Sequence, residues 1–312
     1  MNVRGAGRYA PSPSGDLHVG NLRTAMLAWL FARSSGRRFL MRIEDTDRGR
    51  DAGAAESQLA DLAAIGLEWD GVPVIQSERI AEHEAAIAAL AEQGLVYECP
   101  CTRREILEAP SAPHAPSGAY PGTCRDRSAT ERAQERDRIA PRSPALRLKV
   151  PEDAREVSFT DAVVGRVSGL VDDLVLRRGD GAIAYNLAVV VDDAAMGVDQ
   201  VVRGDDLASS TPRQILLQHL LGLPAPPDME YAHVPLVLGP SGARLAKRDG
   251  AVTLQDLGIA GIDAGRVRAM LAGSLRLAVP GEAVTMAQLL DRFDPALLPR
   301  EPWVFDPRDA TS

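Results

Sequence analysis

Aromatic residues, cysteines and long apolar runs are scarce in this chain of 312 residues. Aromatics make up 4% of the sequence, so Ala, Leu and Val must supply most of any core. The longest apolar runs, residues 25–32 and 187–191, are far shorter than the roughly 20 residues of a membrane-spanning helix. The N-terminus lacks the apolar segment of a secretory signal, and three clustered cysteines do not resemble a secreted disulfide framework. We therefore expect a cytoplasmic protein with no membrane contact.

An excess of basic charge is also missing. The chain carries 35 Lys and Arg against 43 Asp and Glu, a net charge of −8. This balance argues against a broadly basic nucleic-acid surface, although a local patch is compatible with it. Residues 125–142 mix both signs and predict a solvated helix rather than an RNA-binding face.

What the chain does contain is an alternation of extended and helical patterns. Hydrophobic residues reach 45%, enough for a sizeable core. At roughly 150 residues per domain, the length suggests two domains, or one large domain with an appendage. Such alternation is typical of a parallel sheet covered by helices in an α/β fold. Strands are expected over 7–10, 39–43, 72–75, 146–150, 157–159 and 174–176, and helices over 21–34, 52–65, 79–93, 262–272 and 286–292. Thr211 is expected to cap a further helix that Pro212 begins and Gly222 ends.

A Pro-rich turn leads from the first strand into a helix at His18-Val19-Gly20. A helix N-terminus presents free N–H groups and a positive dipole, so this turn can hold a nucleotide phosphate. Gly20 leaves room for a flat base, and His18 can donate a hydrogen bond to a phosphate. An ordinary capped turn explains the segment equally well when it is taken alone. The other histidines in helix or strand patterns, His83, His219 and His233, are expected to serve in packing.

Three short sequence motifs follow one another along the chain. They are RYAPSPSG over 8–15, RIEDTD over 42–47 and GPSGARLAKR over 239–248. In this order they resemble the class I aminoacyl-tRNA synthetases, specifically the glutamyl group, across about residues 8–254. The third stretch is similar to the Lys-Met-Ser-Lys-Ser loop of that class. It has Arg244 for the first Lys and Ala246 for the Ser, and it keeps Lys247.

The resemblance implies a site that binds L-glutamate and ATP. Arginine forks suit the two carboxylates of glutamate because they bind them in a planar, bidentate manner. The motifs assign glutamate binding to Arg8, Ser12, Glu44, Tyr185 and Arg203, with Glu44 on the ammonium, and leave open which arginine takes which carboxylate. They assign ATP binding to His18, Gly20, Asn21 and Lys247. His18 and Lys247 are the expected catalytic residues, with Mg²⁺ on the leaving pyrophosphate, because the transition state needs positive charge and positioning.

The resemblance also implies a class I synthetase fold with a Rossmann-like parallel sheet. We expect the first half of the catalytic domain over 1–96 and its second half over 181–250. An inserted subdomain that resembles an acceptor-binding domain would occupy 97–180, and a small helical appendage would occupy 251–312.

Cys99, Cys101 and Cys124 lie in the insertion, close enough in sequence to share a metal ion. Structural zinc sites normally have four ligands, so a fourth donor is required. The family has a tyrosine in this role, which falls on Tyr120, whereas His114 and Asp126 are the alternatives. Plain reduced cysteines remain the competing interpretation to a structural zinc ion.

The length of the chain after the third motif distinguishes between members of the family. Only 62 residues follow Gly250, so the large anticodon-binding domain of glutamyl-tRNA synthetases is not expected. The chain looks like the truncated paralogues that activate glutamate without tRNA and transfer it to queuosine in the anticodon loop of tRNA(Asp). A truncated glutamyl-tRNA synthetase that charges the 3′ end, another nucleotidyl transferase and a catalytically silent RNA-binding paralogue are the alternatives. We expect a monomer.

Overall fold

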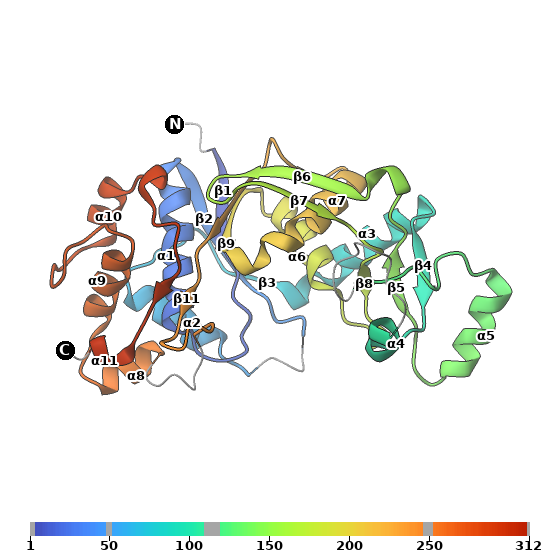
Figure 1. Ribbon diagram of the computed structural model, residues 1–312, viewed down its shortest axis with the longest axis horizontal. Coiled ribbons are helices and arrows are strands. Elements are labelled where there is room, and N and C mark those ends of the chain that lie inside the picture. The colour runs from blue at the N-terminus through green and yellow to red at the C-terminus, as the bar shows by residue number, and fades with distance from the viewer. Residues whose placement is uncertain (1–3, 48–51, 109–118, 246–251, 311–312) are drawn as a thin grey trace.

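A parallel five-stranded sheet lies at the centre of the molecule (Figure 1). The computed structural model describes residues 4–47, 52–108, 119–245 and 252–310. In spatial order the strands are β10 (Glu230–Val234), β9 (Val198–Gly204), β1 (Arg4–Tyr9), β2 (Arg37–Ile43) and β3 (Val74–Ile75). Every pairing in this sheet is parallel, which confirms the predicted α/β class.

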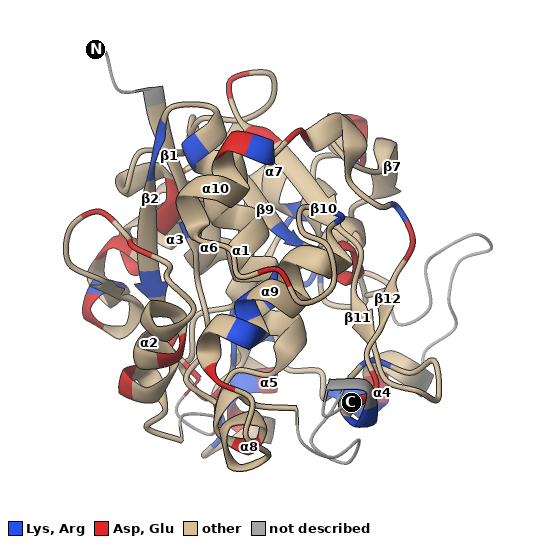
Figure 2. Ribbon diagram, turned by 90° about the vertical axis from the view of Figure 1, so that its left-hand side faces the viewer, with Lys and Arg blue, Asp and Glu red and all other residues tan. Residues whose placement is uncertain are grey.

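Helix α1 (Val19–Ser34) covers one face of the sheet and contacts β1, β2 and β9. Its sequence is apolar almost all round because it is buried on both sides, with Leu22 and Leu30 fully inaccessible. Three helices from the C-terminal region share its core: α8 (Leu254–Ile259), α9 (Ala264–Ser274) and α10 (Met286–Arg292). Helix α2 (Ala55–Ala64) adds Leu62 to the same cluster. Figure 2 shows basic and acidic positions intermixed at this end of the molecule.

The second face of the sheet carries α3 (Ile80–Glu92), α6 (Tyr185–Ala195) and α7 (Thr211–Leu221), which share a separate core. Helix α7 ends at Gly222 in the left-handed conformation, with φ of 64°, as predicted. Its beginning differs from the prediction, because Ser210 is the N-cap residue and Thr211 is already helical. The Thr211 hydroxyl is engaged by Arg203 instead of by the helix N-terminus.

The segment that interrupts the alternation forms its own layer at the right of Figure 1. It contains an antiparallel sheet of β4 (Val96–Cys99), β5 (Ala145–Leu148) and β8 (Val175–Arg177), with α4 (Arg103–Glu108) and α5 (Ala129–Ile139) beside it. Helix α5 bears out the predicted solvated helix, since Ile139 alone in it is buried. A hairpin of β6 (Glu156–Asp161) and β7 (Gly165–Leu170) returns toward the central sheet and contacts α7 and β10.

Short elements complete the described chain. They are β11 (Val237–Leu238), β12 (Trp303–Val304), α11 (Pro307–Ala310) and the 3₁₀ helices η1 (Gln76–Arg79), η2 (Glu152–Ala154), η3 (Asp205–Ser210) and η5 (Pro295–Leu297). Strands β4, β7 and β10 were not among the expected ones. None of the helices in the described ranges has the length and apolar character required to cross a membrane.

Candidate functional site

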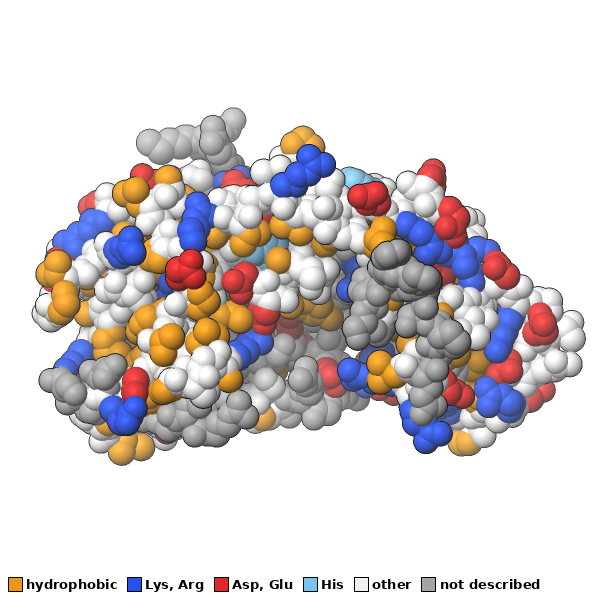
Figure 3. All heavy atoms as spheres, in the orientation of Figure 1, with side chains coloured by type: hydrophobic (Ala, Val, Ile, Leu, Met, Phe, Trp, Pro, Cys, Tyr) orange, Lys and Arg blue, Asp and Glu red, His pale blue; other side chains and the backbone are white. Residues whose placement is uncertain are grey.

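A cleft of about 880 Å³ opens at the carboxyl ends of β1, β2 and β9. Its walls are the turn after β1, the first residues of α1, the end of β2, and the start of α6. Glu44, Tyr185 and Arg203 line it from three different elements. Figure 3 shows the surface indented between the body on the left and the inserted strands on the right. Ligands commonly bind at this edge of an open parallel sheet.

His18 is the N-cap residue of α1 and faces the cleft. Its Nδ1 accepts a hydrogen bond from the backbone N–H of Asn21 at 3.3 Å, and the Asn21 side chain accepts from the His18 N–H. Burial, reinforced by the charge of Arg244, lowers the pKa of His18 to about 4. The ring is therefore neutral at pH 7, and because Nδ1 accepts, Nε2 carries the proton and can donate it to a ligand.

A buried ionic chain supports one wall of the cleft. Arg8 donates from Nε to Asp193 at 3.2 Å, and Arg42 donates from Nη1 to the same carboxylate at 2.5 Å. Arg42 also pairs with Glu44 at 2.9 Å. Burial opposes ionisation of Asp193, but the two arginines hold its pKa below the usual range. Two cations and two carboxylates thus balance each other within this chain.

Arg203 supports the opposite wall with a different set of partners. Its guanidinium donates to four groups: His233 Nε2 at 3.1 Å, Thr211 Oγ1 and Gln214 Oε1 at 2.8 Å, and the Tyr185 hydroxyl at 3.5 Å. The side chain is almost fully buried, at 5% exposure. Among the described residues no carboxylate pairs with it. Its charge is held in place by neutral groups.

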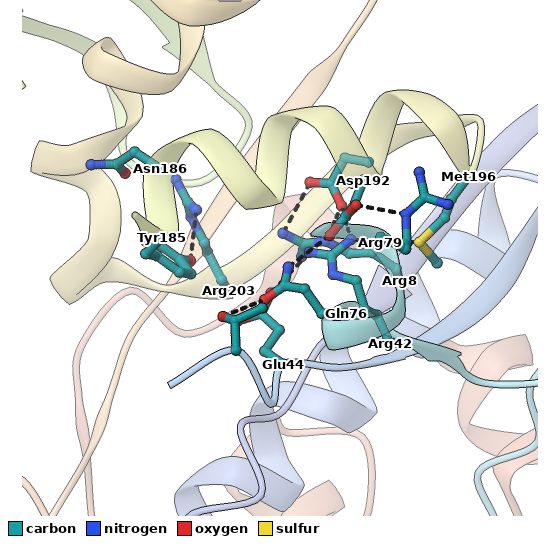
Figure 4. A network of polar contacts seen from close by, with 12 residues as sticks. Arg8, Arg42, Glu44, Gln76, Arg79, Tyr185, Asn186, Asp192, Met196 and Arg203 are labelled. Carbon is teal, nitrogen blue, oxygen red and sulfur yellow. Dashed lines mark hydrogen bonds and ion pairs between the residues drawn. The ribbon is translucent and has the colours of Figure 1, made fainter. Parts of the chain in front are cut away.

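Tyr185 connects the two walls at the start of α6. Burial raises the pKa of its phenol, Glu44 acts in the same direction, and Arg203 and Arg8 act against them. The hydroxyl therefore lies within range of charges from both walls, and it stays protonated at neutral pH. Figure 4 shows Tyr185 beside Arg203, with Glu44 and Gln76 next to the other charged side chains.

The other predicted residues are distributed unevenly around the cleft. Ser12, Gly20 and Asn21 line it with His18. Arg8 lies behind the lining, because its guanidinium is turned to Asp193. Arg244 lines the cleft and pairs with Asp206 at 2.7 Å. Lys247 and Ala246 lie outside the described residues.

Sequence reasoning missed the carboxylates at the end of α6. Asp193 joins Arg8 to Arg42, and Asp192 contacts Gln76, Arg79 and His83 in the same buried region (Figure 4). The signal was present, because two acidic residues follow the apolar run 187–191 and Arg42 is the one charge between apolar neighbours in its strand. A buried charge requires a partner, so these residues could have been paired.

Packing, the role expected for the other histidines, does not fully describe two of them. His83 Nε2 donates to Asp192 at 2.9 Å, and His233 contacts Asp161 at 2.6 Å, so both belong to buried polar networks. His219 is exposed on α7.

The three cysteines form a second candidate site. The sulfurs of Cys99, Cys101 and Cys124 lie within 4.8 Å of one another. The Tyr120 hydroxyl is 3.4 Å from the Cys99 sulfur, and the Arg147 guanidinium stacks on the Tyr120 ring. The three sulfurs are close enough to share one metal ion, and the Tyr120 hydroxyl lies beside them. Of the alternatives, Asp126 is 80% exposed and pairs with Lys149, and His114 lies outside the described residues.

Comparison with known proteins gives a consistent result. A family model described as the catalytic domain of class I tRNA synthetases (E and Q) matches residues 5–309. A glutamyl-Q tRNA(Asp) synthetase of Nocardia farcinica is 62% identical over 97% of this chain and 93% of its own length. One of Symbiobacterium thermophilum is 47% identical over 95% and 94%.

A crystal structure of a glutamate tRNA ligase from Elizabethkingia meningosepticum, in complex with its amino acid, is similar to the whole fold. The TM-score is 0.81 at 27% identity, over 98% of this chain and 68% of that one. The likeness covers the central sheet and the insertion together.

Proposed function

The chain belongs to the family of class I tRNA synthetases for glutamate and glutamine, and from that membership we propose its reaction. It activates L-glutamate with ATP to glutamyl adenylate without tRNA, and transfers the glutamyl group to queuosine at the wobble position of tRNA(Asp). The enzyme is a ligase of the glutamyl-Q tRNA(Asp) synthetase type.

One observation carries the substrate assignment: the unpaired charge of Arg203 faces the same cleft as Glu44. A buried cation held by neutral groups favours an anionic ligand, since a carboxylate supplies the missing counter-charge. Glu44 offers a carboxylate to the ammonium. The second carboxylate is assigned to Arg8, whose guanidinium is turned to Asp193 behind the cleft lining and would have to turn toward the ligand. Glutamate has two carboxylates and one ammonium and so matches this set.

The remaining cleft residues suit adenylate formation. The glutamate α-carboxylate attacks the α-phosphorus of ATP, pyrophosphate leaves, and no covalent enzyme intermediate is needed. Neutral His18 donates from Nε2 to a phosphate oxygen, and the N-terminus of α1 adds its free N–H groups. Lys247 supplies positive charge to the transition state. Mg²⁺ bound with ATP would neutralise the pyrophosphate oxygens.

The acceptor is assigned by likeness to the two glutamyl-Q tRNA(Asp) synthetases. Each covers more than nine-tenths of this chain and matches it over more than nine-tenths of its own length. A hydroxyl of the queuosine ring then attacks the same mixed anhydride that a ribose hydroxyl attacks in ordinary charging, and AMP leaves.

Two assays test the assignment. Purified protein with Mg²⁺ should catalyse glutamate-dependent ATP–pyrophosphate exchange without tRNA. Labelled glutamate should then pass to tRNA(Asp) that contains queuosine, and neither to the same tRNA without queuosine nor to tRNA(Glu). Labelling of tRNA(Glu) would favour 3′-end charging, and no exchange at all would favour a silent paralogue.

We further propose that Cys99, Cys101, Cys124 and Tyr120 hold one structural zinc ion. The ion would join β4 to the turn at 120–124, where few apolar side chains pack. Elemental analysis should find about one zinc per chain, and Cys101→Ser should lose it and lower Tm. Wild-type protein purified without chelators and free of zinc would contradict the proposal.

A further inference from the structure

We propose that Asp161 is a positioning residue for Arg203 and acts through the ring of His233. The inference rests on the proposed function, in which Arg203 binds a carboxylate of glutamate. Asp161 ends β6, His233 lies in β10 and Arg203 lies in β9, so the hairpin β6–β7 reaches the cleft through this line of contacts.

The three side chains form a continuous buried line. Asp161 Oδ2 lies 2.6 Å from His233 Nδ1, and Nε2 on the other side of the ring lies 3.1 Å from Arg203 Nε. The side chains of Asp161 and His233 are both fully inaccessible. Thr211 Oγ1 is 3.0 Å from the same Nε2 and accepts from Arg203 Nη2. Water therefore cannot replace the contact between Asp161 and His233, and only Arg203, at 5% exposure, reaches the cleft.

The chemistry of the contacts fixes the tautomer of His233. Arginine Nε can only donate, so His233 Nε2 must accept. A neutral ring that accepts at Nε2 carries its proton at Nδ1, where the Asp161 carboxylate accepts it. Burial keeps the ring neutral by lowering the pKa of His233, with Asp161 acting against this and Arg203 acting with it. Asp161 therefore sets which nitrogen faces Arg203.

The His233 imidazole separates the Asp161 carboxylate from the Arg203 guanidinium, and this separation matters for ligand binding. Asp193 touches Arg8 directly and balances its charge, whereas Asp161 is one imidazole away from Arg203. The carboxylate orients the arginine without pairing with it. The guanidinium thus keeps its free charge for the ligand while its direction is fixed.

Asp161→Asn isolates this role from a general effect on folding. Asp161 Oδ1 also accepts from the backbone N–H groups of Val163, Val164 and His233 at 2.8, 2.9 and 3.1 Å, and an asparagine oxygen at that position can keep all three contacts. Its NH₂ group would face Nδ1 and drive the proton to Nε2, against the Arg203 N–H. We expect the glutamate KM in tRNA-free exchange to rise about tenfold, with the ATP KM and kcat within about twofold.

Three controls keep the outcomes separate. In a His233→Gln background, where the tautomer no longer matters, Asp161→Asn should add less than about threefold to the glutamate KM. Asp173→Asn removes another buried carboxylate, which contacts Tyr97 and Arg125, and should change Tm without changing the glutamate KM. Arg203→Met tests the proposed function itself, since an unchanged glutamate KM there would remove Arg203 from the substrate site.

A spectroscopic readout tests the tautomer in the wild type as well as in the variant. Nitrogen-15 NMR of labelled histidines should show His233 protonated at Nδ1 in the wild type at pH 7.5 and at Nε2 in Asp161→Asn. A wild-type His233 protonated at Nε2 or at both nitrogens would overturn the inference. So would an unchanged glutamate KM in Asp161→Asn, or equal rises in the glutamate and ATP KM, while Arg203→Met raises the glutamate KM.

Discussion

The two arginines at the walls of the cleft are held in opposite ways. Arg8 belongs to an ionic chain in which Asp193, Arg42 and Glu44 balance one another. Arg203 is equally buried but lies among an imidazole, a hydroxyl, an amide and a phenol. The first wall is electrically complete before a ligand arrives, whereas the second is not.

Because of this difference, substitutions at the two walls should affect different properties: the stability of the fold at one wall and the affinity for the ligand at the other. Removing a cation from the balanced wall leaves a buried carboxylate without its partner, which is strongly destabilising. Removing Arg203 leaves neutral groups that lose a hydrogen bond, a smaller cost, but it takes the counter-charge away from the ligand. The balanced wall should therefore respond chiefly in unfolding and the Arg203 wall chiefly in binding.

The largest effect is expected from Arg42→Met. Arg42 is fully buried and pairs with Asp193 at 2.5 Å and with Glu44 at 2.9 Å. Loss of the guanidinium should lower the free energy of unfolding by about 3–5 kcal/mol, measured by urea denaturation. Methionine replaces the side chain out to the position of Nε, so the packing of the apolar stem is largely kept. Unfolding within about 1 kcal/mol of wild type would show that the ionic chain is not a stabilising unit.

Arg203→Met is the matched change at the other wall. We expect the glutamate KM to rise on the order of 100-fold, about 2.7 kcal/mol, because the ligand carboxylate loses its charged partner. The free energy of unfolding should fall by less than in Arg42→Met. The contrast between the walls would be lost if Arg203→Met unfolded as easily as Arg42→Met and left glutamate binding unchanged.

The same contrast explains what the sequence could predict. Chain-order motifs identified Arg8, Glu44, Tyr185 and Arg203. The structure brings the last three to one cleft, because β2 and β9 end and α6 begins at one edge of the sheet, and it places Arg8 behind the cleft lining. The motifs could not predict which arginine is neutralised. That depends on Asp193 and Asp161, which lie 185 and 42 residues from their arginines in the chain. Local patterns mark Asp193 and Arg42 as charges that need buried partners, but they do not say which arginine each carboxylate contacts.

The short strands were missed for a related reason. Strands β7 and β10 alternate too briefly to stand out, and their positions are set by packing against α7 and by pairing with β6 and β9. Thr211 was misassigned as a helix cap because its hydroxyl has a tertiary partner, Arg203, that no local pattern reveals.

The smallest effect is expected at His18. Within the part of the chain that the structure describes, its ring makes no hydrogen bond to either arginine wall and is held by Asn21 in the first turn of α1. A Cβ on Gly20 would lie 3.0 Å from the His18 ring atoms Cε1 and Nδ1 and 3.3 Å from Val237 Cβ, so Gly20→Ala requires the ring to shift by a few tenths of an ångström. Misplacing one hydrogen-bond donor should lower kcat for ATP–pyrophosphate exchange roughly tenfold, about 1.4 kcal/mol. Alanine favours a helix over glycine, so Tm should not fall. Gly258→Ala in α8, where an added Cβ meets nothing within 4 Å, is the matched control and should leave kcat unchanged. Equal kcat in the two variants would mean that the His18 ring position does not limit the reaction, and that the catalytic contribution of the cleft lies with the arginine walls and Lys247.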